Sequence, residues 1–234
     1  MSQKGFFPWE LEWPVDQAGY ELEHWPAMEG SSLLGSSPPT DFIRAQGGPP
    51  RYYWPMQQHP CLYRQFAEIC SSADGVLAFA SRFGMSSVQQ DFRKANGQRE
   101  EVSAVLNTAE LIRQICARVD VGNKPEAAGL WAEHAMPLVM VAISENESRT
   151  GFEEVLVPID LRSALLLQTK DTIIRDQRVR RCRNEDCTEY FRVGQGAATE
   201  RREFCSLRCR VASTRRQKKR NAATAAEHQL HREL

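Results

Sequence analysis

The cysteines of this chain are unevenly distributed along it. Four of the seven lie between residues 182 and 209, with the spacing Cys-x4-Cys, seventeen residues, then Cys-x3-Cys. Zinc in a structural site takes four soft ligands in a tetrahedral arrangement, and two short turns that each offer two thiolates can supply them. The sequence therefore predicts one structural Zn²⁺, held by Cys182, Cys187, Cys205 and Cys209.

Two other interpretations of the cluster are less favoured. A thioredoxin-type redox centre needs only one Cys-x2-Cys near a strand, and a catalytic zinc needs an open position that four thiolates do not leave. The five histidines form no His-Glu-x-x-His motif, and His228 and His231 are interpreted as solvated tail residues. Cys61, Cys70 and Cys116 have no partner at ligand spacing and are interpreted as small core residues.

Local signals around the cluster predict how the ligands are presented. Cys182 and Cys187 can form one tight turn, and the residues after them are numerous enough for a short hairpin that turns at residues 194–196. Ser206 is a typical helix N-cap, which places Cys209 in the first turn of a helix. Turn, hairpin and helix together predict a treble-clef-like zinc module.

A run of positive charge follows the last cysteine of the cluster. On a helix these cations spread round most of the circumference and leave no apolar face of the kind that binds a membrane surface. Phosphate backbones accept such a distribution, so we expect DNA, or else RNA, as the partner; a solvated tail is the alternative. The predicted nucleic-acid-binding residues are Arg210, Arg215, Arg216, Lys218, Lys219 and Arg220.

The overall charge is zero, but it is divided unequally. Residues 1–169 carry 13 Lys and Arg against 21 Asp and Glu, whereas residues 170–220 carry 16 against 7. No apolar run approaches the roughly 20 residues of a membrane span, and the N-terminus lacks the apolar region of a signal peptide. We therefore expect a cytoplasmic protein without membrane association, in which a cysteine cluster binds metal rather than forming disulfides.

The elements that must position these residues give an α+β fold that is mainly α. Residues 1–59 lack a clear period and predict an extended arm rich in Pro and Trp. Residues 60–178 predict a helical body with one β-hairpin, and residues 179–234 the zinc module with its basic helix. Within the body, helices are expected at about 73–83, 98–119, 125–135 and 161–177, and two strands at 137–144 and 152–159 joined by a turn that ends at Gly151.

The end of the chain resembles a known family. The pattern Cys-x4-Cys-x3-Phe, followed by Arg-Arg-Glu-Phe-Cys-Ser-x-x-Cys-Arg and a basic helix, is similar to the bacterial CGNR-type zinc finger. The resemblance covers about the last 55 residues and implies the same four cysteine ligands. It also implies an α-rich N-terminal domain of the ABATE type, which senses a signal or forms a homodimer, in a transcription regulator.

Two functions from different classes follow from the sequence. The first is a zinc-dependent nucleic-acid-binding regulator, and the second is a zinc-stabilised module that binds an acidic protein surface. An enzyme is not expected, because the acidic body contains no recognisable nucleophile–base spacing, Gly-rich phosphate loop or clustered acid pair.

Overall fold

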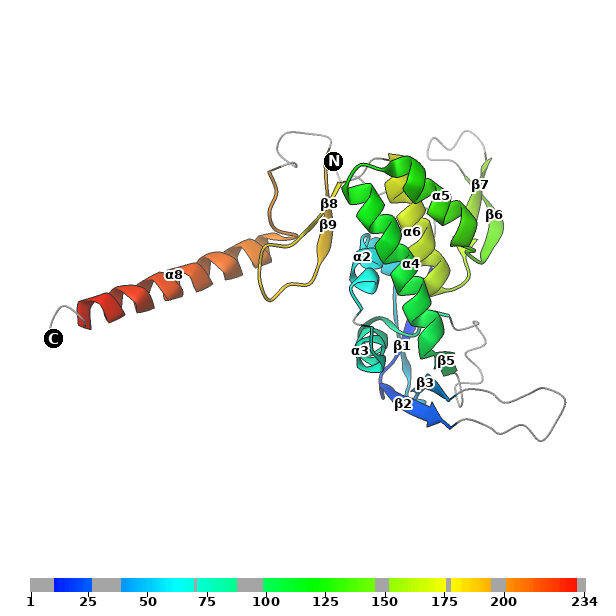
Figure 1. Ribbon diagram of the computed structural model, residues 1–234, viewed down its shortest axis with the longest axis horizontal. Helices are drawn as coiled ribbons and strands as arrows, with labels where there is room; N and C mark the ends of the chain where they lie inside the picture. Colours follow the sequence, from blue (N-terminus) through cyan, green and yellow to red (C-terminus); the bar gives the residue numbers. More distant parts are fainter. Residues whose placement is uncertain are drawn as a thin grey trace. The chain divides into compact units, whose positions relative to one another are not determined.

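The computed structural model divides the chain into two compact units, Met1–Asp176 and Gln177–Leu234. Within the described residues the fold is α+β and mainly α, as the sequence predicts (Figure 1). None of the helices described is long and apolar enough to cross a membrane. The structure describes residues 11–26, 39–69, 71–87, 99–145, 152–175, 178–194 and 201–230.

Helices fill the middle of the first unit. The longest of them, α4 (Val102–Asp120), packs against α2, α5 and α6. It buries one stripe of apolar side chains spaced three or four residues apart, which includes Val105, Ala109 and Ile112, and it confirms the helix predicted at about 98–119. The other helices of this unit are α1 (Pro55–Gln58), α2 (Leu62–Ala67), α3 (Ala73–Phe83), α5 (Lys124–His134) and α6 (Leu161–Arg175).

Small antiparallel sheets complete the first unit. One pairs β1 (Trp13–Asp16) with β4 (Pro50–Tyr53). A second has the order β2 (Tyr20–Trp25), β3 (Thr40–Ala45), β5 (Arg99–Glu101). The predicted hairpin is present as β6 (Val139–Glu145) and β7 (Phe152–Pro158), whereas its turn at Gly151 lies outside the described residues.

Local sequence signals set the helix ends of the first unit. The Ser72 side chain accepts a hydrogen bond from Gly75 N at 3.2 Å and begins α3. Gly84 ends α3 with φ of +85°, and a Cβ there would lie 2.4 Å from Pro14 O. Asp160 Oδ1 accepts from Ser163 N at 2.7 Å and caps α6. Ser and Asp are typical N-cap residues, and Gly is typical where φ is positive at a helix end.

The first 59 residues differ from the predicted extended arm. Their described part forms four of the strands and α1, and it belongs to the core of the first unit. Trp13 is 1% exposed and its Nε1 donates to Met85 O at 3.1 Å, while Ile43 is completely buried. Trp25 packs on Phe42 and Trp54 stays partly exposed. Strands of four to six residues are too short for a period to show in the sequence.

The second unit, called the finger below, contains a two-stranded ladder and one long helix. Strand β8 (Arg178–Arg181) pairs with β9 (Tyr190–Val193), and α8 (Leu207–Leu230) follows. The hairpin therefore encloses Cys182–Cys187 instead of following it, which corrects the predicted hairpin. Residues 201–206 form no strand, and of the predicted turn at 194–196 only Gly194 lies within the described residues.

Candidate metal centre and basic helix

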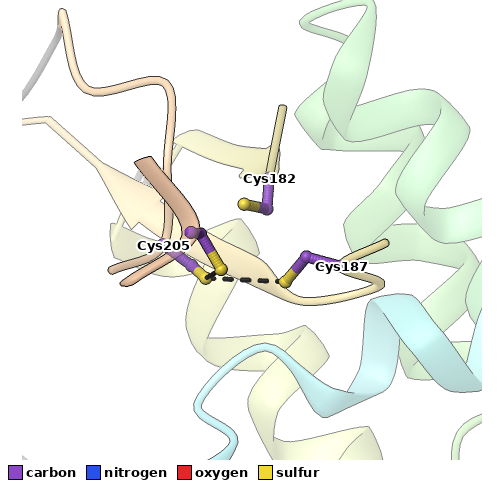
Figure 2. A group of neighbouring side chains, drawn as sticks. Cys182, Cys187 and Cys205 are labelled. Atoms are coloured by element: carbon purple, nitrogen blue, oxygen red, sulfur yellow. Dashed lines mark hydrogen bonds between the residues drawn. The ribbon is translucent and has the colours of Figure 1, made fainter. Parts of the chain in front are cut away.

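The four predicted cysteine ligands come together in the finger (Figure 2). Their sulfur atoms all lie within 4.8 Å of one another. Cys205 Sγ is 3.6 Å from Cys187 Sγ and 3.5 Å from Cys209 Sγ. Sulfurs at about 2.3 Å from a tetrahedral zinc are about 3.8 Å apart. The thiols can therefore hold one metal ion with little movement.

Backbone hydrogen bonds fix the ligands on two turns. Cys187 N donates to Asn184 O at 2.8 Å, which closes the segment Cys182–Cys187, the knuckle. Cys182 N donates to Glu189 O at 2.9 Å and joins the knuckle to the hairpin. On the other side, Cys209 N donates to Ser206 Oγ at 3.3 Å, so Ser206 caps α8 and presents Cys209 from its first turn. The predicted cap is confirmed.

The apolar core of the finger is small and consists largely of the site itself. Cys182, Phe191 and Val193 are buried, and the partly buried Phe204 and the other three cysteines pack against them. Arg202 lies over the Phe191 ring, with its guanidinium carbon 5.1 Å from the ring centre. Cys61 and Cys116 are buried in the first unit, as expected, and Cys70 lies outside the described residues.

The thiols have unequal affinities for protons. Burial raises the pKa of Cys187 and of Cys205, whereas a hydrogen bond with Ser206 lowers the pKa of Cys209 to about 7. Four thiolates this close repel one another, and a bound dication offsets that repulsion. The four thiols together could supply all four ligands of a tetrahedral metal ion.

Two of the six predicted nucleic-acid-binding cations contact the knuckle. Arg220 donates to both carboxylate oxygens of Glu185, at 3.1 and 2.6 Å. Arg216 pairs with Asp186, lies 3.6 Å from Glu185 and donates to Asn184 Oδ1 at 3.4 Å. The arginine charges lower the pKa of Glu185, chiefly through the hydrogen bond from Arg220. These arginines attach α8 to the acidic part of the knuckle.

The other four predicted cations are exposed. Arg215, Lys218 and Lys219 have no carboxylate partner among the residues that the structure describes. Arg210 lines an open hollow of about 500 Å³ at the start of α8, together with Arg201. Arg208 is also exposed, and the sequence reasoning did not include it; its spacing of seven residues from Arg215 places it on the same side of a helix.

Comparison with known proteins adds no identification. No family model matches the sequence, and no curated protein matches it at a significant level. The fold and the site define an α+β chain with a cluster of four thiols, which could hold a metal ion, at the start of a basic helix. Any functional conclusion must therefore rest on these residues.

Proposed function

We propose that the protein is a zinc-dependent nucleic-acid-binding protein, a transcription regulator whose finger binds duplex DNA. The observation that supports the proposal most is the position of the thiol cluster. It lies at the first turn of a 24-residue helix, and exposed cations follow along that helix within the next three turns. A metal ion at this point fixes the direction of the helix, so that its charges approach a partner in one orientation.

Zinc is the metal that fits the donor set best. Four thiolates in tetrahedral spacing are soft ligands that suit Zn²⁺, whereas Mg²⁺ and Ca²⁺ require oxygen ligands. Zinc has no redox chemistry of its own, which agrees with a purely structural role. Its contribution here is to hold the knuckle against the start of α8, and the knuckle then holds α8 further along through Arg216 and Arg220.

The first unit has a different role in this proposal. It carries an excess of acidic residues, so we do not expect it to bind phosphates. We assign to it the sensing of a signal or the formation of a homodimer, as the resemblance to CGNR-type proteins implies. A dimer would present two fingers, and DNA-binding dimers recognise paired half-sites in this way.

One observation favours a second candidate function. Leu207 and Val211 are exposed on α8, at 75% and 40%. Apolar side chains on the surface of a basic helix suit a protein partner with an acidic, partly apolar groove. The second candidate is therefore a zinc-stabilised module that binds such a protein and no nucleic acid.

A salt series with fluorescent duplex DNA tests the first function against the second. Zinc-loaded protein should raise the anisotropy of the DNA at low salt, and log Kd should depend linearly on log salt concentration. Each neutralised phosphate contributes about 0.9 to the slope, so four contacts give a magnitude of about 3.6. Protein treated with a chelator, then re-loaded with zinc, serves as the control for the metal.

The outcomes separate the two functions. Steep salt dependence that weakens when the metal is removed supports the DNA-binding function. No binding of the zinc-loaded chain to DNA or RNA at low salt rejects it and leaves the protein-binding module. Binding that is the same with and without zinc contradicts the role of the metal, because the loose basic segment alone would then explain the affinity.

A further inference from the structure

The basic helix has two sides with different surroundings. Cys209, Arg216 and Arg220 follow one another at spacings of seven and four residues, so they lie on one side of α8. That side faces the metal centre and the knuckle. We call it the inner side. Residues 212, 213 and 216 are partly buried there, whereas most of the other positions between 207 and 224 are exposed.

Four of the five other cations between residues 208 and 219 form a second group, and Arg210 is not part of it. The group consists of Arg208, Arg215, Lys218 and Lys219, at successive spacings of seven, three and one residues. At about 100° per residue they occupy an arc of about 100° round the helix axis. We call this arc the outer side. Along the axis the four span about 16 Å, or eleven residues at about 1.5 Å each. All four side chains are exposed and form no ion pair within the described part of the chain.

The inner arginines are held by groups that phosphate would have to displace. Glu185 receives two hydrogen bonds from Arg220, and Asp186 pairs with Arg216. The Arg216 side chain is 29% exposed and also donates to Asn184, which is itself buried. A phosphate that approached this side would meet two carboxylates within a few ångström, where like charges repel despite screening. The outer side offers positive charge without that repulsion.

From these contacts we infer that the DNA-binding face of the finger is the outer side, formed by Arg208, Arg215, Lys218 and Lys219. Arg216 and Arg220 do not contact DNA but hold α8 to the knuckle. The inference rests on the proposed function and assigns its contacts. The occupant is duplex DNA, since its phosphates supply the dense negative charge that a row of four unpaired cations complements.

The two sides make different contributions to salt dependence. Cations that neutralise phosphates release counterions, and each one removed lowers the magnitude of the log–log slope by about 0.9. Cations that only orient the helix leave the slope unchanged, although their removal weakens binding at every salt concentration alike. The slope therefore separates contact from positioning, even though both kinds of variant lose affinity.

Two double variants with the same change in charge provide the test. Arg215→Gln/Lys219→Gln removes two outer cations, and Arg216→Gln/Arg220→Gln removes the two inner ones. Each is measured as the zinc-loaded full chain with the same fluorescent duplex over a salt series. We expect the outer variant to lower the slope by about 1.8 and the inner variant to leave it within error of the wild type.

Single variants cover the case in which the inner double variant does not fold. Arg208→Gln should lower the slope by about 0.9, and Arg216→Gln should not change it. Binding of Co²⁺ to each variant, followed by its absorption spectrum, checks that the thiol site is intact. Arg208→Gln is the sharper of the two tests, because Arg208 is not among the DNA-binding residues predicted from the sequence.

Each outcome has a separate meaning. If the inner variants lower the slope as much as the outer ones, the assignment of the face is wrong although the protein binds DNA. If Arg208→Gln has the slope of the wild type, Arg208 is not part of the DNA-binding face, and the inference that adds it is wrong. If the wild-type chain does not bind DNA at all, the proposed function itself fails.

Discussion

Removal of one thiol from the cluster should unfold the finger without unfolding the first unit. Cys205 is the ligand with two close sulfur neighbours, Cys187 and Cys209, and it precedes the cap of α8. In Cys205→Ala we expect the metal site to be lost and the finger to unfold. The first unit has its own buried core and should keep its fold.

The size of the effect follows from what else stabilises the finger. Apart from the cysteines, its buried apolar side chains are Phe191 and Val193, with Phe204 partly buried. Burial of two such side chains contributes about 3–6 kcal/mol. Structural zinc contributes about 10–16 kcal/mol at neutral pH, which makes the metal the larger contribution. Changes to groups that only support a ligand lower metal affinity about 10–100-fold. The loss of a ligand itself should therefore lower metal affinity by more than about 100-fold.

A cobalt titration measures the effect directly. Reduced, metal-free protein is titrated with Co²⁺, whose absorption reports tetrahedral thiolate ligation, and Zn²⁺ is then added to displace it. Cys61→Ala is the matched control, because it removes a buried cysteine of the first unit that is not a ligand. Wild type and control should bind one ion per chain. Equal affinity in Cys205→Ala, or a finger that stays ordered without metal, would refute the reasoning.

Two further predictions concern the first unit. Ile112→Ala removes a fully buried side chain of α4 and should destabilise this unit by about 2–5 kcal/mol in thermal or denaturant unfolding, whereas the exposed control Ile174→Ala should stay within about 0.5 kcal/mol. A larger effect at the exposed site would show that it is covered in solution. Burial raises the pKa of Glu100, which accepts from Ser86 N at 2.7 Å. Its stabilising contribution is therefore present at low pH and is lost as the pH rises through the folded-state pKa. Glu100→Gln should gain stability relative to the wild type from about pH 4 towards neutrality, and a constant difference in melting temperature would contradict this.

The sequence predicted those parts of the molecule that depend on local signals. The Ser206 cap, the helix α4 and the spacing within each cysteine pair require only neighbours within a few residues. The first strands were missed for the opposite reason. Trp13 and Ile43 are buried by contacts with segments far along the chain, and short strands with Pro and charged residues show no alternation of their own.

The predicted pairing partner of β9 was wrong for a related reason. Residues 190–193 have the character of a strand, but pairing is decided by which strand lies alongside, and the segment on either side can supply it. The structure pairs them with β8, and so the hairpin closes around the knuckle. The inner position of Arg216 and Arg220 could not be predicted either, because it requires the knuckle to fold back onto the third and fourth turns of the helix.

The contacts between the knuckle and α8 also determine how much of the helix has a fixed orientation. An isolated helix rich in polar residues is marginally stable in water, and packing normally supplies most of its stability. Among the side chains described, Arg220 is the last on α8 that touches the knuckle. The dense positive charge ends at the same residue, because the ten residues from Asn221 to Leu230 contain one acidic group and no Lys or Arg. The fixed part of the helix, about 20 Å from Leu207 to Arg220, thus coincides with its charged part. Charges placed further along would lie beyond the last described contact with the knuckle and would be less firmly oriented. The coincidence is the arrangement expected if the metal and the two arginines serve to hold the outer cations in place.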